Sequence, residues 1–162
     1  EPPHFAFFIL TSEKPDALLQ TVRSRCTRFA LEPSGEEQAV SDDEAVRLLA
    51  PYLTAVAGKR EGSMMLAALG MEKTPRRALI GVMGVMQAAL RDAIFRAEGL
   101  REPPLQPALA KQSEALASAL TPKRLLAFYD FTDELVHRIS RNAASAAVTC
   151  ALTSDVYRIC YQ

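Results

Sequence analysis

The residues with the clearest potential for chemistry are Ser24, Arg25 and Cys26, which end a predicted helix over residues 17–25. An arginine at a helix C-terminus can project outward and stabilise charge on a γ-phosphate held by a neighbouring subunit, as an arginine finger does. A simpler interpretation is that Arg25 and the nearby arginines only complement the negative end of the helix dipole. The spacing alone leaves both interpretations open.

Other patterns for catalysis or cofactor binding are absent from the sequence. It contains no GxxxxGK[ST] loop that could hold a nucleoside triphosphate, and no GxSxG or HExxH motif. His4 and His137 belong to no recognised metal-binding motif, and each is interpreted as an ordinary strand-edge or helix-surface residue. The three cysteines, Cys26, Cys150 and Cys160, include no CxxC pair and predict neither a zinc site nor a disulfide framework. We therefore expect no cofactor, no metal and no catalysis by this chain alone.

Composition narrows the class of protein further. Of the 162 residues, 49% are hydrophobic and 23% are charged, and 19 basic residues balance 19 acidic ones. This composition is typical of a globular chain with a hydrophobic core. The balanced charge excludes a protein whose whole surface is basic and binds nucleic acid non-specifically. The apolar run over residues 5–10 follows no basic segment and so does not resemble a signal peptide, and no apolar run is long enough to span a membrane. We expect a cytoplasmic protein without membrane contact.

The elements that would position Arg25 form a short strand–helix–strand unit. Residues 4–10 are almost uniformly apolar and predict a central strand that is buried on both faces. A turn over residues 11–16 leads into the helix, and residues 27–31 alternate as a second short strand does. Alone, the first strand would expose apolar side chains and a backbone edge. We therefore expect it to self-associate with another copy of the chain, to pack non-natively or to be poorly ordered.

From residue 34 onward the pattern is helical, so the predicted fold is mainly α. Ser41 begins a capping box whose helix should run to about residue 57, with a kink or break at Pro51. A second helix is predicted over residues 61–69. Thr-Pro pairs at 74–75 and 121–122 predict two further helix starts, another helix is predicted over 108–120, and Asn142 is the predicted N-cap of the last helix. The predicted core includes Leu79, Val82, Met86, Leu90, Leu126, Leu135, Val148 and Leu152.

Residues 7–26, FFILTSEKPDALLQTVRSRC, resemble the sensor-1 strand, the following helix and the Ser-Arg-Cys motif of bacterial clamp-loader AAA+ subunits. The resemblance implies that Arg25 is an arginine finger acting in trans, and that Ser24 and Cys26 pack the turn that presents it. It also implies that Thr11 or Ser12 occupies the sensor-1 position. Residues 1–35 would then be the C-terminal remnant of an AAA+ α/β domain.

The helical remainder resembles, more loosely, the collar domains of the delta-prime subunits of DNA polymerase III. The best local matches are residues 90–93 and the pair Arg141-Asn142, whereas Ala144 stands where the family often has a second asparagine. The resemblance implies a shortened lid over residues 36–72 and a helical collar for oligomerisation over residues 73–162. The family's phosphate-binding loop, acidic metal-binding strand and zinc module have no counterpart here. We therefore expect a fragment that is cut just before the sensor-1 strand.

The role implied by the resemblance is that of a subunit of the DNA polymerase III clamp-loader complex. Such a subunit helps to assemble the ATPase ring and supplies Arg25 in trans for loading the sliding clamp in DNA replication. Its direct partners would be the other clamp-loader subunits, and it would meet the sliding clamp and primed DNA through the complex. The alternatives are a gamma/tau subunit of the same complex, which shares both segments, and an unrelated helical protein-interaction module.

Overall fold

The computed structural model of this protein describes residues 8–12, 15–29 and 41–162. Helices account for most of these residues, which confirms the predicted mainly α fold. The chain divides into two compact units, Glu1–Gly35 and Glu36–Gln162. The first unit carries the Ser-Arg-Cys segment, and the second carries the long helices.

The described part of the first unit contains two short helical segments, the 3-10 turn η1 (Pro15–Ala17) and the single-turn helix α1 (Gln20–Arg23). The helix predicted over residues 17–25 is therefore shorter than expected. Residues 8–10 and 27–29, the described parts of the two predicted strands, form no strand, and residues 4–7 and 30–31 lie outside the described residues. A strand needs a neighbour to take up its backbone hydrogen bonds, and the described part of this unit supplies none. The strand prediction is wrong over the described residues.

The second unit is built from consecutive helices over residues 41–162, joined by short turns and one longer loop. The helix predicted over residues 61–69 has the same bounds in the structure. The helix predicted to begin at residue 108 begins at Ala110, directly after a 3-10 turn. The elements are α2 (Asp42–Ala57), α3 (Glu61–Leu69), α4 (Arg76–Ala97), η2 (Pro107–Leu109), α5 (Ala110–Ala119), α6 (Pro122–Ser140) and α7 (Ser145–Tyr161).

Two of the helix starts follow from side-chain caps that the sequence predicts. Ser41 Oγ accepts the backbone N–H of Glu44 at 3.3 Å, and Thr121 Oγ1 accepts that of Arg124 at 3.4 Å. At the start of α4 the N-cap is the proline of the Thr-Pro pair, one residue later than predicted. The helix α2 is not broken at Pro51, because this residue lies on the exposed side, where the carbonyl group left without a partner can bond to water.

The helices α2, α4 and α6 end in the same backbone motif. Each is followed by a residue with positive φ, which is Lys59 (53°), Gly99 (73°) or Asn142 (68°). In each case the amide of the next residue donates to the carbonyl group five residues before it, as in a Schellman motif. Asn142 therefore ends α6, and the prediction that it caps α7 is wrong. Asparagine is one of the few residues with a side chain that adopts this conformation readily.

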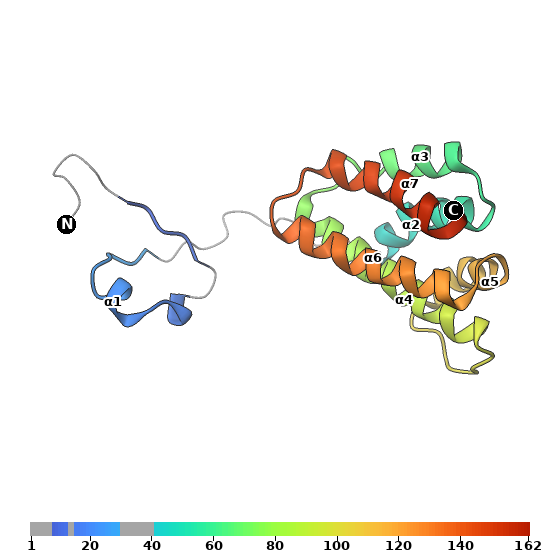
Figure 1. The fold of residues 1–162 in the computed structure, drawn as a ribbon, viewed down its shortest axis with the longest axis horizontal. Coiled ribbons are helices and arrows are strands. Elements are labelled where there is room, and N and C mark those ends of the chain that lie inside the picture. The colour runs from blue at the N-terminus through green and yellow to red at the C-terminus, as the bar shows by residue number, and fades with distance from the viewer. Residues whose placement is uncertain (1–7, 13–14, 30–40) are drawn as a thin grey trace. The chain divides into compact units, whose positions relative to one another are not determined.

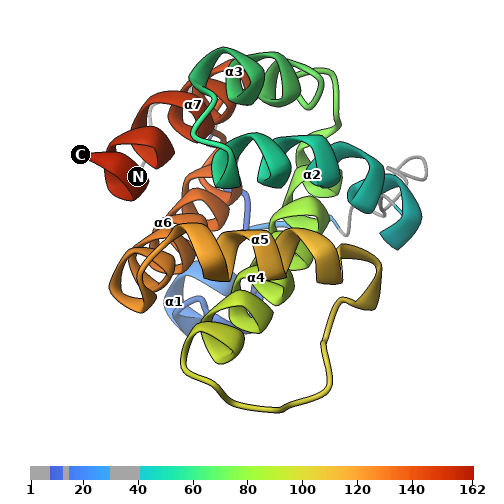
Figure 2. The ribbon, with the colours of Figure 1, turned by 90° about the vertical axis from the view of Figure 1, so that its right-hand side faces the viewer.

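The helices of the second unit pack in a closed circuit. The helix α4 lies beside α6, α6 packs against α7, α7 against α3, α3 against α2, and α2 against α4 (Figure 1). The helix α5 packs against α2 and α4, and the loop that precedes it makes a wide arc from the end of α4 (Figure 2). The circuit encloses a single apolar core to which every one of these helices contributes.

Seven of the eight predicted core residues are buried, and the exception is Leu126. Its side chain is 52% exposed, whereas the neighbouring Leu125 is fully buried. Successive helix positions point about 100° apart, so an error of one residue moves a side chain from the core to the surface. The prediction that Leu126 is buried is wrong, and Leu125 occupies the core position that was predicted for Leu126.

The helix α4 is the longest element and the centre of the packing. By length and composition alone it would suffice to cross a lipid bilayer, yet half of its most apolar stretch is buried within the unit. Its buried residues include Leu79, Met83, Met86 and Leu90, and it contacts α2, α5 and α6. A core helix of this kind explains its apolar character without a membrane.

Candidate functional site

The predicted arginine lies in the turn directly after α1. The amide of Arg25 donates to the carbonyl oxygen of Val22 at 3.1 Å, and Ser24 Oγ donates to that of Thr21 at 3.2 Å. These two bonds close the turn and fix the backbone from which Arg25 extends. Ser24, Arg25 and Cys26 are all exposed, so the side chains of Ser24 and Cys26 are not packed within the described part of the unit.

The charges around this turn distinguish Arg25 from its neighbour Arg23. Arg23 pairs with Asp16 at 3.3 Å across the segment from η1 to α1. The guanidinium of Arg25 has no hydrogen-bond or ion-pair partner among the described residues. A guanidinium that is always charged and unpaired can bind a carboxylate or a phosphate group from outside the unit.

The two residues predicted for the sensor-1 position, Thr11 and Ser12, lie in irregular backbone ahead of η1. Both are exposed, and both belong to the same compact unit as Arg25. Their hydroxyl groups can donate and accept hydrogen bonds, as a residue that senses a phosphate must. The role predicted for them stays a prediction.

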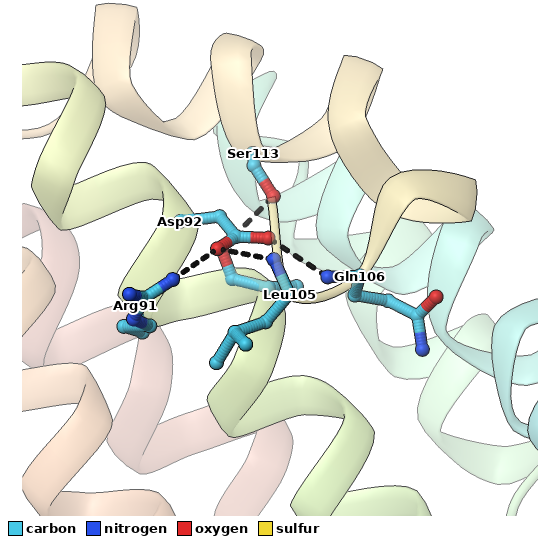
Figure 3. Close-up of polar contacts among 6 residues, drawn as sticks. Arg91, Asp92, Leu105, Gln106 and Ser113 are labelled. Carbon is cyan, nitrogen blue, oxygen red and sulfur yellow. Dashed lines mark hydrogen bonds and ion pairs between the residues drawn. The ribbon is translucent and has the colours of Figure 1, made fainter. Parts of the chain in front are cut away.

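A buried carboxylate in the second unit is the main polar feature that the sequence analysis missed. Asp92 lies on the inner side of α4 and is only 4% exposed. Its two carboxylate oxygens accept the backbone amides of Leu105 and Gln106, each at 3.0 Å, and Arg91 donates to it at 3.2 Å (Figure 3). Nearby, the hydroxyl of Ser113 donates to the α4 backbone at 2.9 Å.

These contacts give Asp92 a definite structural task. An ionised carboxylate is a strong acceptor, and two backbone donors with a neighbouring guanidinium compensate for its burial. Arg91 is held in place in turn, because its guanidinium lies 4.1 Å from the centre of the Phe95 ring. The carboxylate thus fastens the distal end of the loop between α4 and η2 to the body of the helix. An acidic residue on an apolar helix face, followed by a proline-rich loop, was the available sequence signal.

A second polar contact joins two helix ends that are distant in sequence. The side-chain carbonyl of Asn142, in the turn after α6, accepts a hydrogen bond from the guanidinium of Arg76 at the start of α4. Arg141, which the resemblance placed at the start of the last helix, is instead the C-cap of α6. The pair Arg141-Asn142 therefore terminates a helix and anchors a neighbouring one.

The C-terminal helix α7 is fastened to the core by buried polar groups. The hydroxyl of Tyr52 donates to the carbonyl oxygen of Leu152 at 2.5 Å, and that of Tyr161 donates to the carbonyl oxygen of Val56. Burial raises the pKa of Tyr52 well above its ordinary value and raises the pKa of Cys160 to about 12. A thiol with so high a pKa is a poor nucleophile, which assigns Cys160 to the core.

The surface beside α3 is unusually apolar for a helix of nine residues. Three of its large side chains, Met65, Leu66 and Leu69, are exposed. Leu66 also borders an open hollow of about 590 Å³, which we call the α2–α3 hollow. It is lined by Ala50, Pro51, Thr54, Arg60, Ser63, Leu66, Ala67 and Gln112.

The described part of the chain gives no geometric sign of a metal site, since no three of its His, Cys, Asp and Glu side chains are grouped to hold an ion. Comparisons with protein-family models, with curated proteins and with solved structures returned no match to this chain. The candidate sites are therefore the exposed Ser-Arg-Cys turn and the apolar surface beside α3, each judged on its own geometry.

Proposed function

We propose that this protein acts as a subunit of a bacterial DNA polymerase III clamp loader, most like delta-prime. In this role the second unit is a helical collar that holds the subunit in the ATPase ring, in the cytoplasm. The first unit supplies Arg25 to the nucleotide site of the neighbouring subunit. The chain itself hydrolyses no ATP, and it meets the sliding clamp and primed DNA through the complex.

The observation that carries this proposal is that the Arg25 side chain is exposed and has no partner among the described residues. A finger must project from its own subunit, so it should be exposed, unpaired and presented by an ordered turn. Arg25 is exposed, has no partner among the described residues and extends from a turn closed by two hydrogen bonds. The pairing of Arg23 with Asp16 further supports the choice of Arg25 over its neighbour. The finer assignments, a remnant of an AAA+ domain in the first unit and a collar in the second, belong to this proposal.

The exposed apolar surface on α3 favours a second candidate, a helical protein-interaction module outside replication. Contiguous exposed apolar side chains mark interaction surfaces more often than random surface does. This observation alone does not require Arg25 to act. The two functions therefore differ in what they predict for an Arg25 variant. A gamma/tau subunit shares the prediction for Arg25 with delta-prime and differs in the identity of its ring position.

The test is to reconstitute the ring with the subunit as wild type, as Arg25→Ala and as Arg25→Lys, and to measure ATP turnover and clamp loading together. Arginine fingers contribute about 10³–10⁵ in rate at the site they serve. Because only one of several sites is affected, we expect partial loss of total ATPase and a larger loss of clamp loading. Arg25→Lys should rescue poorly, since an ammonium lacks the planar fork.

Arg28→Ala is the matched control, because Arg28 is a neighbouring exposed arginine in the same unit. It should leave both activities near the wild-type values, and all variants should assemble into the ring. Normal clamp loading by a correctly assembled Arg25→Ala ring would show that Arg25 is not an arginine finger. It would leave the helical interaction module as the better proposal.

A further inference from the structure

The α2–α3 hollow adjoins exposed apolar side chains of α3, those of Leu66 and Leu69. Leu66 belongs to both, because it lines the hollow and is 73% exposed. Leu69, about 60° from Leu66 around the helix axis, extends this surface along α3. Met65 lies about 160° from Ser63 and Ala67 and faces away from the hollow. Half of the large hydrophobic residues exposed between residues 41 and 162 lie on this helix of nine residues. Singly exposed leucines need no explanation, but a cluster on one short helix does.

The floor of the hollow is shaped for close approach of another backbone. Small side chains, those of Ala50, Ser63 and Ala67, line it between the two helices. The hydroxyl of Thr54 is already used, because it donates to the carbonyl oxygen of Ala50 at 2.7 Å. An extended peptide would bring unpaired backbone groups against this mostly apolar lining. A helix satisfies its own backbone and packs its side chains into such grooves.

Charge adds a requirement for the occupant. Arg60, the N-cap of α3, is the one charged residue that lines the hollow, and its guanidinium has no side-chain partner among the described residues. A helix that covers the hollow would remove water from this guanidinium. Burying a guanidinium without a partner is costly, whereas a carboxylate that reaches it forms a charge-assisted hydrogen bond.

From this surface we infer a docking site for an amphipathic helix of a partner protein. The partner helix has apolar side chains at i, i+3, i+4 and i+7, which contact Leu66 and Leu69, and an acidic residue at the end that meets Arg60. The inference is independent of the clamp-loader proposal, because it rests on the hollow, the apolar helix face and the unpaired cation alone.

The test uses a designed helical peptide of about 16 residues, long enough to form a helix, with four leucines at that spacing and one glutamate. A matched peptide carries lysine in place of the glutamate. Both are titrated into the full chain, the affinity is measured by fluorescence anisotropy, and the site is mapped by amide chemical shifts. We expect shifts centred on α2 and α3, and binding of the glutamate peptide that is tighter by about tenfold or more, because only its carboxylate gives the covered guanidinium a charge-assisted hydrogen bond.

Variants of the chain decide whether the proposed contacts are made. Leu66→Gln should weaken binding about tenfold or more, because a buried leucine is lost from the interface. Arg60→Glu should reverse the preference between the two peptides. Leu126→Gln is the matched control, since Leu126 is an exposed leucine on α6, and it should bind as wild type does.

Three results would overturn the inference. The first is no binding, or shifts that map away from α2 and α3. The second is equal affinity for the two peptides in the wild type and in Arg60→Glu, which would remove the charge requirement. The third is a dimer of the chain, detected by sedimentation without peptide and abolished by Leu66→Gln, which would assign the surface to a second copy of the chain.

Discussion

The substitution Asp92→Ala tests whether one buried carboxylate holds the loop between α4 and η2. The change removes two hydrogen bonds from backbone amides, those of Leu105 and Gln106, each 3.0 Å long. Hydrogen bonds to a charged group contribute about 1.5–3 kcal/mol each, so the pair sets an upper limit of about 3–6 kcal/mol. Leu105 is exposed and its amide can rebind water, and the released loop regains conformational entropy. We expect a net loss of about 2–4 kcal/mol in the free energy of unfolding.

The assay is urea unfolding of the full chain, followed by amide hydrogen exchange at Leu105 and Gln106. Asp133→Ala is the matched control, because Asp133 is an exposed aspartate on a neighbouring helix and should change stability by less than about 0.5 kcal/mol. In Asp92→Ala the two loop amides should exchange much faster than in the wild type. Amides in the core of α4 should exchange faster only to the extent that the free energy of unfolding of the whole chain falls. Equal stability of the two variants, with both loop amides still protected, would refute the role assigned to Asp92.

Three further predictions follow from the core and from the first unit. Leu90→Ala should cost about 2–5 kcal/mol in urea unfolding, whereas Leu126→Ala should cost less than about 0.5 kcal/mol, and equal costs would mean that the register of one helix is wrong. Stability should fall as pH rises above about 9, because the unfolded chain releases the Cys160 proton there while burial holds the pKa of the folded thiol at about 12. Each such proton contributes about 1.4 kcal/mol per pH unit, so Cys160→Ala should flatten the fall, and an unchanged slope would contradict the assignment. The amide of Ile9, whose side chain is 81% exposed, should exchange without protection when the chain is monomeric, and full protection there would contradict the absence of strand pairing.

Much of the helical unit could be predicted because its signals are local. Ser41 and Thr121 cap their helices through the next turn of the same chain, and the bounds of α3 follow from the residues within and beside it. The apolar spacing in α4 predicts its buried face because a helix repeats every 3.6 residues. These features need no knowledge of how the helices meet.

The errors concern choices that only tertiary contacts decide. Leu125 and Leu126 are equally apolar neighbours, and the position of α4 determines which of them is buried. Asn142 has the chemistry of a cap at either end of a helix, and the guanidinium of Arg76, 66 residues away, holds its side chain at the end of α6. In both cases the competing conformations differ by one contact that lies far away in the sequence.

The candidate sites were predictable to different degrees. Ser24, Arg25 and Cys26 were found by their order in the sequence, and the turn that exposes them is closed by local bonds. Asp92 was missed as a polar anchor because its donors lie 13 and 14 residues farther along the chain. The α2–α3 hollow was missed because it exists only between packed helices, and apolar residues of a helix are ordinarily assigned to the core.

The most direct test of the proposed function is whether the chain enters a clamp-loader ring. The chain would be co-expressed with the gamma/tau and delta subunits of the source organism and the purified complex weighed by native mass spectrometry. A delta-prime subunit of an established clamp loader, expressed with its own gamma/tau and delta subunits, serves as the positive control. The account predicts one copy of the chain in each ring, at the delta-prime position. A control ring that assembles as expected, together with a gamma/tau–delta complex that never contains the chain, would contradict it.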